Sequence, residues 1–263
     1  FTMQHTLTVS GGNEKSNYRV SADYRKANGI GLRSDREEYG ARASVMHTTK
    51  GGLFTINLNG APRIIYRDNA DWSVFRNAIE ANPTTPLMDP ENPNRYYNFQ
   101  GQVAGSNPVE LQKLEKDHAD TKLLDWDGTI KLNLLPLLAK EGTSNHTLNT
   151  QVTFADHQYS NNNSWFRPST STIAINNGRE GEASRSYSKE RQYIVEWITN
   201  WNAHFGEHNL KAMAGYSYQY SQYSGFNAEN KDFPNDGLGP DNLGSGELAK
   251  EEGEVLKIGR AHV

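Results

Sequence analysis

Histidine and carboxylate side chains are the only candidates for metal or acid–base chemistry in this sequence. It contains eight His residues and no Cys, so a thiol nucleophile, a disulfide and a Cys-ligated metal are all excluded. The histidines are scattered along the chain. His204 and His208 are four residues apart, but Gly206-Glu207 lies between them and predicts a turn rather than a helix face. We therefore expect no enzyme centre, no metal site and no cofactor.

Acidic residues gather in one region whose oxygen atoms would suit Ca²⁺. They lack the regular spacing of an EF-hand loop, so solvated loop charge is favoured over a calcium site.

The stretch 28–31 (NGIG) superficially suggests a phosphate loop, but no helical pattern follows it, and a turn is favoured. The net charge is −4 and no basic stripe is present, so nucleic acid is not an expected partner. The acidic region considered for Ca²⁺ consists of Asp68, Asp71, Asp117, Asp120, Asp125 and Asp127.

Aromatic residues in long connecting segments offer a different chemistry, which is ligand binding. Rings that neighbour Asn and Arg can stack on sugar rings or hold a peptide. We predict substrate contacts from Trp72, Tyr96, Tyr97 and Trp165, and Phe166 lies beside them. The alternative is that these rings pack the loops together or against a partner protein.

The composition indicates what kind of scaffold carries these rings. Of the 263 residues, 35% are hydrophobic and 10% are aromatic, including 13 Tyr and 5 Trp. The mean hydropathy is −0.80. A low hydropathy with many Tyr and Trp is typical of a membrane β-barrel, which has an apolar outer face and a polar interior. No apolar run approaches the roughly 20 residues of a membrane helix.

Eight segments alternate in hydrophobicity with a period of two, which predicts strands with two unlike faces. The clearest pair is Lys189–Phe205 and His208–Tyr223, joined by a tight hairpin at Gly206-Glu207. Both are longer than the roughly 9–11 residues that a tilted strand needs to cross a bilayer. The other strands are expected at Met3–Ser10, Tyr18–Arg25, Glu37–Thr48, Gly52–Gly60, Thr121–Leu134 and His146–Tyr159.

Short and long connections alternate along the chain. The short ones are Gly11–Ser16, Thr49–Gly51, Leu135–Asn145 and Gly206–Glu207. The long ones are Ala27–Arg36, Ala61–Asp120, Ser160–Ser188 and the region after Tyr223. Outer-membrane barrels have short periplasmic turns and long extracellular loops. The predicted fold is therefore all-β, a transmembrane antiparallel β-barrel with about eight strands in this chain and long extracellular loops.

Two local features of this barrel can also be predicted. In the loop Ala61–Asp120, residues Asp71–Ala81 show helical spacing, with Asp71 as the N-cap, and Asn82-Pro83 ends the helix. Four charged residues are expected to face the lumen and to pair with one another. These are Arg19, Asp23, Arg25 and Arg42.

The segment Ser10–Arg42 resembles a barrel segment of the SusC/RagA-like, TonB-dependent importers. The matching residues are Gly11, Gly12, Lys15, Tyr18, Ser21, Tyr24, Gly29, Ile30 and Arg42. Asn82–Pro86 with Asn107-Pro108, Ala212–Gly215 and Phe233–Asp236 are also similar to the family.

The resemblance implies a bacterial outer-membrane barrel of 22 strands, filled by an N-terminal plug and powered by TonB. It also implies a SusD-like surface lipoprotein as partner, contact with outer-membrane lipid, and import of glycans or peptides. Two alternatives remain open, namely a passive porin or adhesive barrel and a soluble secreted carbohydrate-binding β-protein.

The two ends of the chain suggest its domain organisation. The chain starts at Phe1 without a start Met, so we expect the natural N-terminus to be missing. Residues 1–256 are expected to be a partial receptor barrel that lacks the plug. Residues 257–263 (KIGRAHV) match the codons that begin a common short-read sequencing adapter, and they are interpreted as a non-native tail from adapter read-through.

Overall fold

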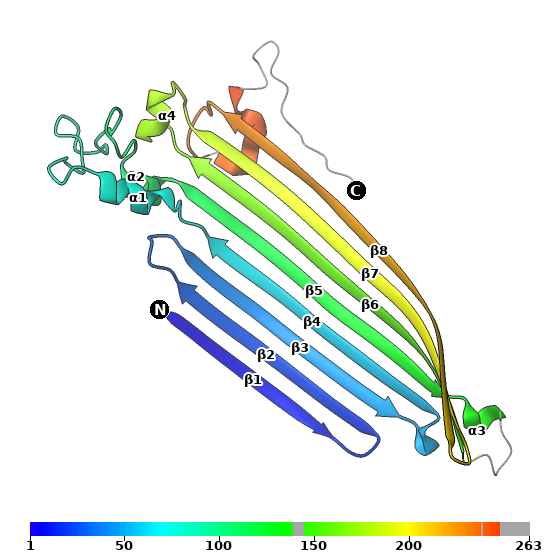
Figure 1. Ribbon diagram of the computed structural model, residues 1–263. Coiled ribbons are helices and arrows are strands. Elements are labelled where there is room, and N and C mark those ends of the chain that lie inside the picture. The colour runs from blue at the N-terminus through cyan, green and yellow to red at the C-terminus, as the bar shows by residue number, and fades with distance from the viewer. Residues whose placement is uncertain (139–144, 238, 248–263) are drawn as a thin grey trace.

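The computed structural model describes residues 1–138, 145–237 and 239–247. The tail interpreted as non-native, 257–263, and most of the expected turn 135–145 lie outside these residues. Eight strands form one sheet in which each strand is antiparallel to its neighbours in the chain, in the order β1 to β8 (Figure 1). They are β1 (Thr2–Gly12), β2 (Ser16–Asn28), β3 (Asp35–Thr48), β4 (Phe54–Asp68), β5 (Lys116–Asn133), β6 (His146–Arg167), β7 (Glu182–Phe205) and β8 (His208–Lys231).

This sheet confirms the predicted all-β fold and each of the eight strands. The strand register is kept throughout, with one interruption between β3 and β4, so the side chains divide between two faces. We call one the apolar face, which carries exposed residues of every strand. Its members include Leu7, Val20, Val45, Leu58, Ile130, Val152, Trp197 and Tyr216.

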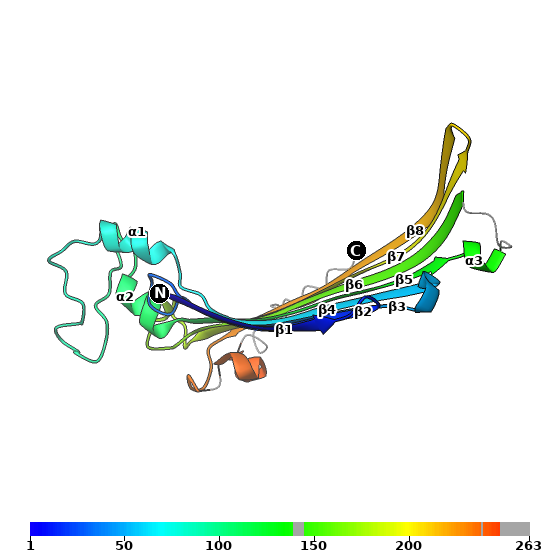
Figure 2. The same ribbon diagram turned by 90° about the horizontal axis from the view of Figure 1, so that it is seen from below.

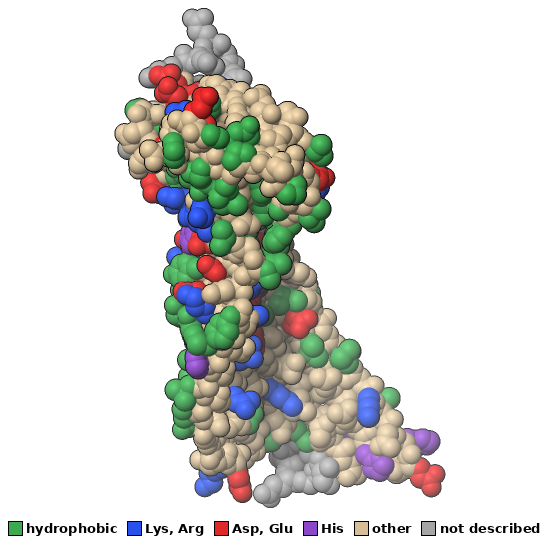
Figure 3. Space-filling view, turned by 90° about the vertical axis from the view of Figure 1, so that its left-hand side faces the viewer, with side chains coloured by type: hydrophobic (Ala, Val, Ile, Leu, Met, Phe, Trp, Pro, Cys, Tyr) green, Lys and Arg blue, Asp and Glu red, His purple; other side chains and the backbone are tan. Residues whose placement is uncertain are grey.

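The other face, which we call the polar face, carries Thr, Ser, Asn and charged residues. The sheet is strongly curved (Figure 2). Figure 3 shows Lys and Arg side chains in the hollow of the sheet and a column of hydrophobic side chains along the opposite side. The two faces therefore differ as the walls of a membrane barrel do, with lipid on one side and polar contents on the other.

The strands β4 to β8 are all longer at the loop end than the alternation predicted, and β5 starts at Lys116 instead of Thr121. β6 continues to Arg167 instead of ending at Tyr159, β7 starts at Glu182 instead of Lys189, and β8 continues to Lys231. β4 runs past Pro62 to Asp68, although Gly60 was the expected end. Pro62 has no N–H, and no pairing with β3 is formed at 61–62, but pairing with β5 continues through both residues. The expected loops 61–120 and 160–188 are therefore shorter, at 69–115 and 168–181.

Short helices lie at the two ends of the sheet. α1 (Ser73–Glu80), α2 (Pro108–Leu114), α4 (Thr172–Asn176) and the 3₁₀ segment η2 (Gly239–Ser245) lie at the loop end. α3 (Leu135–Leu138) and the 3₁₀ turn η1 (Lys50–Gly52) lie at the turn end (Figure 1). Among the described residues, no helix has the length and apolar character needed to span a membrane.

The predicted helix at 71–81 is confirmed as α1, with one difference at its start. Asp71 accepts a hydrogen bond from the backbone N–H of Ser73 at 2.8 Å, but Trp72 occupies the position next to the helix. Asp71 therefore still accepts from a free N–H of the first helical turn, but it lies one residue before the N-cap position that was predicted for it. α2 and α4 were not predicted, because each is too short to show a helical period.

A small core holds η2 against the sheet. Phe166, Ala183 and Phe233 are buried together, and Leu243 of η2 packs against them. Phe166 was grouped with the candidate ligand-binding rings, but its side chain lies in this core on the apolar face of β6.

Candidate functional site

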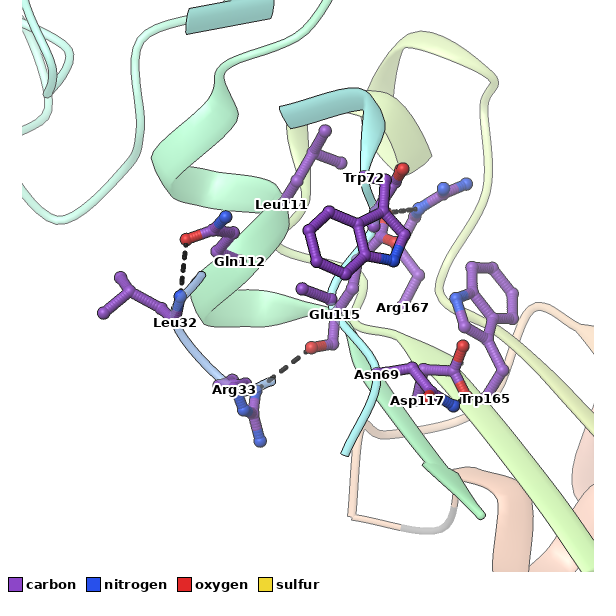
Figure 4. Close-up of a pocket in the computed structure, with 12 residues that line it drawn as sticks. Leu32, Arg33, Asn69, Trp72, Leu111, Gln112, Glu115, Asp117, Trp165 and Arg167 are labelled. Carbon is purple, nitrogen blue, oxygen red and sulfur yellow. Dashed lines mark hydrogen bonds and ion pairs between the residues drawn. The ribbon is translucent and has the colours of Figure 1, made fainter. Parts of the chain in front are cut away.

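A pocket of about 480 Å³ opens where the ends of β4, β5 and β6 meet the loops (Figure 4). One wall comes from the strand ends and the residues beside them, and the other comes from α2 and the turn between β2 and β3. Trp72 stands over the opening. The lining residues are Leu32, Arg33, Asn69, Ala70, Asp71, Trp72, Leu111, Gln112, Glu115, Asp117, Trp165 and Arg167.

The strand-side wall uses polar-face positions. Asp117 and Trp165 are direct neighbours across β5 and β6, so both side chains project from the same face. Asn69, one residue past β4, donates from its backbone N–H to the carbonyl of Asp117 at 2.9 Å and from Nδ2 to Oδ1 at 3.2 Å. These bonds extend the pairing of β4 with β5 by one residue and fix Asn69 and Asp117 at the rim of the pocket.

Arg167 holds the back of the pocket in place. Its Nε donates to Glu115 Oε1 at 2.6 Å and its Nη1 donates to Glu182 Oε2 at 2.7 Å. Its guanidinium also lies 4.9 Å from the centre of the Trp165 ring, which is a favourable cation–π distance. Burial raises the pKa of Glu115, and the charge and hydrogen bond of Arg167 oppose this rise. Trp165 is thus presented on a rigid, charged support.

The loop-side wall is built around α2. Asn107 caps the helix by accepting from the N–H groups of Val109 and Glu110. At the other end, Arg33 Nη1 donates to the carbonyls of Lys113 and Glu115, both at 3.1 Å. A cation is favourable at a helix C-terminus. Arg33 has a φ of 56°, which is unusual for a residue with a side chain, so the loop is held in a strained form that places Arg33 there.

Contacts between distant loops make this wall rigid. Glu110 is buried, and its carboxylate accepts from the N–H and the hydroxyl of Thr172 at the start of α4, both at 2.5 Å. Asn98 and Asn176 exchange two hydrogen bonds between their side-chain amides, at 2.7 and 3.0 Å. The loop 69–115 and the loop 168–181 therefore form one platform at the end of the sheet.

The four predicted contact residues are placed differently. Trp72 and Trp165 line the pocket, although 92 positions separate them in the sequence. Trp72 is 64% exposed and stacks on Phe75 with ring centres 5.5 Å apart. Tyr96 and Tyr97 lie in the proline-rich part of the loop and do not line the pocket. Tyr96 forms a β-bridge with Met88, and the Tyr97 carbonyl accepts from Asn107.

Sequence reasoning missed the polar residues of the pocket, among them Arg33, Glu115 and Arg167. Their contacts join segments about 50 to 80 positions apart in the sequence. No local sequence pattern predicts contacts between residues so far apart. A partial signal existed in Asn107-Pro108, which is an N-cap followed by Pro at the first helical position and could have revealed α2.

Further along the polar face, a second cavity of about 610 Å³ lies over β1 to β5. Its charged centre is Glu38, whose side chain is 2% exposed and forms ion pairs with Arg25, Arg36 and Arg63 at 3.4, 2.7 and 3.1 Å. Arg63 also contacts Asp23 at 3.3 Å.

These contacts correct the expected pairing of lumenal charges. Asp23 and Arg25 do not pair with each other but with Arg63 and Glu38, which were not singled out. Within the described parts of the chain, Arg19 and Arg42 take part in no ion pair. The missed partners belong to neighbouring strands, and their distance to Asp23 and Arg25 depends on strand register rather than on sequence spacing.

Comparisons with known proteins agree with this architecture. No protein-family model matches the chain. It is 22% identical over 262 residues to the TonB-dependent receptor P3 of Formosa agariphila, covering 95% of this chain and 24% of that receptor. Two solved structures of the RagAB peptide importer and transporter, the first in its open-open state, superpose with TM-scores of 0.72 and 0.71 at 15% identity. Each covers 100% of this chain and 28% of the solved chain.

The chain thus spans about a quarter of the length of the proteins that it resembles. Its eight strands match the barrel of RagA, and the sheet formed by the described residues does not close on itself. The resemblance to the SusC/RagA-like, TonB-dependent transporters, first seen in Ser10–Arg42, is therefore confirmed along the whole chain, and its fold is that of their barrel wall.

Proposed function

We propose that this chain forms part of the barrel wall of a TonB-dependent importer in a bacterial outer membrane, and that the pocket beneath Trp72 contacts the substrate. The apolar face would lie against lipid and the polar face would line the lumen. A SusD-like lipoprotein would cover the loop end, and TonB would act through a plug. The role is transport without chemical conversion.

The pocket itself carries this proposal. Trp72, which is exposed in the loop 69–115, and Trp165, which is half-buried near the end of β6, both line the pocket at the loop end of the polar face, where a solute would enter the lumen. Aromatic rings over a rim of Arg, Asp and Glu suit a ligand with both apolar and charged groups. We therefore propose a peptide as the substrate. This is also the cargo named for RagAB, whose structures the chain resembles at low identity. A glycan is the alternative.

The test uses the full-length protein, purified in detergent, with synthetic peptides of eight to twelve residues and a maltodextrin of similar mass as probes. Trp72→Ala and Trp165→Ala should each weaken peptide binding about tenfold, the loss typical of a buried aromatic contact. Tyr96→Ala is the matched control, because Tyr96 lies in the same loop but outside the pocket. Isothermal titration calorimetry measures the affinities.

Three outcomes would count against this proposal. Equal losses in Tyr96→Ala and Trp72→Ala would show that the pocket is not the binding site. Tighter binding of the maltodextrin would replace the peptide by a glycan. Uptake into cells that continues after the proton gradient is collapsed would indicate a passive porin instead of an energised importer.

A further inference from the structure

A belt of aromatic side chains crosses the apolar face of β5 to β8. The ring centres of Trp126 and Phe154 are 4.9 Å apart, those of Phe154 and Tyr193 are 6.2 Å apart, and those of Tyr193 and Tyr220 are 5.1 Å apart. Aromatic belts of this kind mark the boundary between the hydrocarbon and the polar headgroups of a membrane. The strand residues on the loop side of this belt therefore lie at headgroup level.

A buried carboxylate fixes the position of the belt. Asp156 lies between Trp126 and Tyr193 in the strand register, and its side chain is fully buried. It accepts from Trp126 Nε1 at 3.1 Å, from Gln158 Nε2 at 2.6 Å, and from Arg191 Nε and Nη2 at 2.9 and 3.2 Å. Arg191 is thus neutralised, and its guanidinium lies 5.8 Å from the centre of the Tyr193 ring in the belt.

Two uncompensated lysines lie directly above Arg191 on the same face. Lys122, Ser160 and Lys189 are consecutive cross-strand neighbours on β5, β6 and β7. Both lysines are exposed, and within the described residues neither takes part in an ion pair. The nearest carboxylate on the loop side, Asp120, accepts a hydrogen bond from His118 at 2.9 Å. The row is therefore a local excess of positive charge.

The geometry of this row suits one phosphate group. Two strand spacings place the lysine backbones about 10 Å apart, and two flexible four-carbon side chains can converge over that distance. The Ser160 hydroxyl lies between them as an additional donor. β2 and β3 differ at the corresponding place on the same face, because Lys26 is bound there to Glu37 at 2.6 Å.

We propose that Lys122, Ser160 and Lys189 bind the phosphate headgroup of a lipid in the outer leaflet, whose acyl chains lie over the aromatic belt. The inference rests on the membrane placement proposed above. Basic residues at headgroup level, next to apolar surface, are the pattern by which membrane proteins retain anionic lipids. The two lysines favour an anionic group, and the row lies between the aromatic belt and the loops, where a headgroup joined to acyl chains fits better than a soluble anion.

The test measures lipid retention by the full-length protein in detergent. Native mass spectrometry counts bound dioleoyl phosphatidic acid and, separately, dioleoyl phosphatidylcholine across a titration. Each of Lys122→Gln and Lys189→Gln should weaken phosphatidic acid binding about fivefold and the double variant about 25-fold, because each lysine near a membrane surface contributes about the same attraction. Lys26→Gln, which removes a paired lysine, should change it less than twofold. Lys122→Arg keeps the charge and should retain binding even if a neutral variant folds poorly.

Different results separate the possible failures. Binding of both lipids without preference, or an equal loss in Lys26→Gln, would overturn the headgroup site and leave the barrel proposal intact. Displacement of phosphatidic acid by an equal concentration of inorganic phosphate would overturn the lipid as ligand. Retention of neither lipid by a folded protein would overturn the membrane placement together with the site.

Discussion

The two halves of the polar face share one strand pattern but have opposite charge. β2 to β4 place six arginines and two carboxylates on this face, namely Arg19, Arg25, Arg36, Arg42, Arg63 and Arg67 with Asp23 and Glu38. β5 to β7 place six carboxylates but only one Lys and one Arg there in the described residues, namely Asp117, Asp125, Asp127, Glu182, Glu190 and Glu196 with Lys131 and Arg167.

This difference separates what alternation determines from what it leaves open. Alternation decides which residues face the lumen, and it does so equally well in both halves. The sign of the charge is free to differ, because the lumen side of a barrel tolerates many polar residues. The basic half gathers its charge around one buried carboxylate, whereas Asp125 and Asp127 of the acidic half contact His157 and Asn59. The halves should therefore respond differently to the loss of a carboxylate.

The largest expected effect comes from Glu38→Gln. Three arginines would lose their shared partner, and the free energy of unfolding should fall by about 2 kcal/mol. This is below the usual cost of breaking a buried ion pair, because the arginines are 40–46% exposed and water can solvate them. Urea unfolding of the full-length protein, followed by heat-modifiable gel migration, measures the change.

Glu190→Gln is the matched control for that prediction. Its carboxylate contacts Gln192 and lies in the acidic half, where removing one negative charge relieves repulsion. The variant should be as stable as the wild type or slightly more stable. A loss as large as that of Glu38→Gln would remove the distinction between the two halves.

A reversal of charge in each half should change ligand preference by a smaller amount. Arg42→Glu and Asp125→Lys alter two residues that line the second cavity, one from each half of the polar face. Arg42→Glu should weaken the binding of acidic peptides about fivefold, and Asp125→Lys should weaken that of basic peptides similarly, as expected for one exposed charge. Calorimetry with both peptide sets tests this. Identical changes in both variants would show that the charges of Arg42 and Asp125 do not determine which peptides bind.

The smallest effect concerns Glu115, whose pKa is raised by burial. Between the ordinary pKa of a glutamate and the raised folded value, the folded chain binds a proton more readily than the unfolded chain. The contribution of Glu115 to stability is therefore largest below the ordinary pKa, and it falls as the pH rises to the folded value.

Glu115→Gln removes this titration and supplies the test. The free energy of unfolding of the wild type, relative to Glu115→Gln, should decrease with rising pH across that window and be constant on either side. Unfolding in urea at a series of pH values measures the difference. An increase with pH would mean that Arg167, not burial, sets the ionisation of Glu115.

The sequence was informative where one local rule governs many residues. Eight strands, the tight hairpin at Gly206-Glu207 and the helix α1 follow from period, turn chemistry and capping, all within about ten residues. The extension of β4 was missed because Pro62 argues against a continuing central strand. The extensions beyond Tyr159 and Tyr223 were missed because their polar side chains resemble loop sequence. Only pairing with a neighbouring strand shows that Asn161, Asn163 and Ser186 belong to the wall.

The candidate site was accessible only in part. Large rings in the predicted loops indicated Trp72 and Trp165, but the same reasoning also selected Tyr96 and Tyr97, which do not line the pocket, and Phe166, which lies in the core. The pocket depends on Arg33 reaching α2 and on Arg167 bridging two glutamates. These contacts exist only after the sheet has brought the loops to a common end.

The order of the strands has a consequence for how such a protein can change over evolution. In the part of the chain that the structure describes, each strand pairs only with the strands that precede and follow it, so the loops between strands begin and end on adjacent strands. The segment 69–115 connects β4 to β5, whose pairing runs from Asp68 opposite His118 down to Phe54 opposite Leu132. A different segment inserted at this place would leave every strand with the same neighbours. The wall is thus a constant frame in which one recognition loop can replace another, and a new ligand can be acquired without a change in the strand pairing.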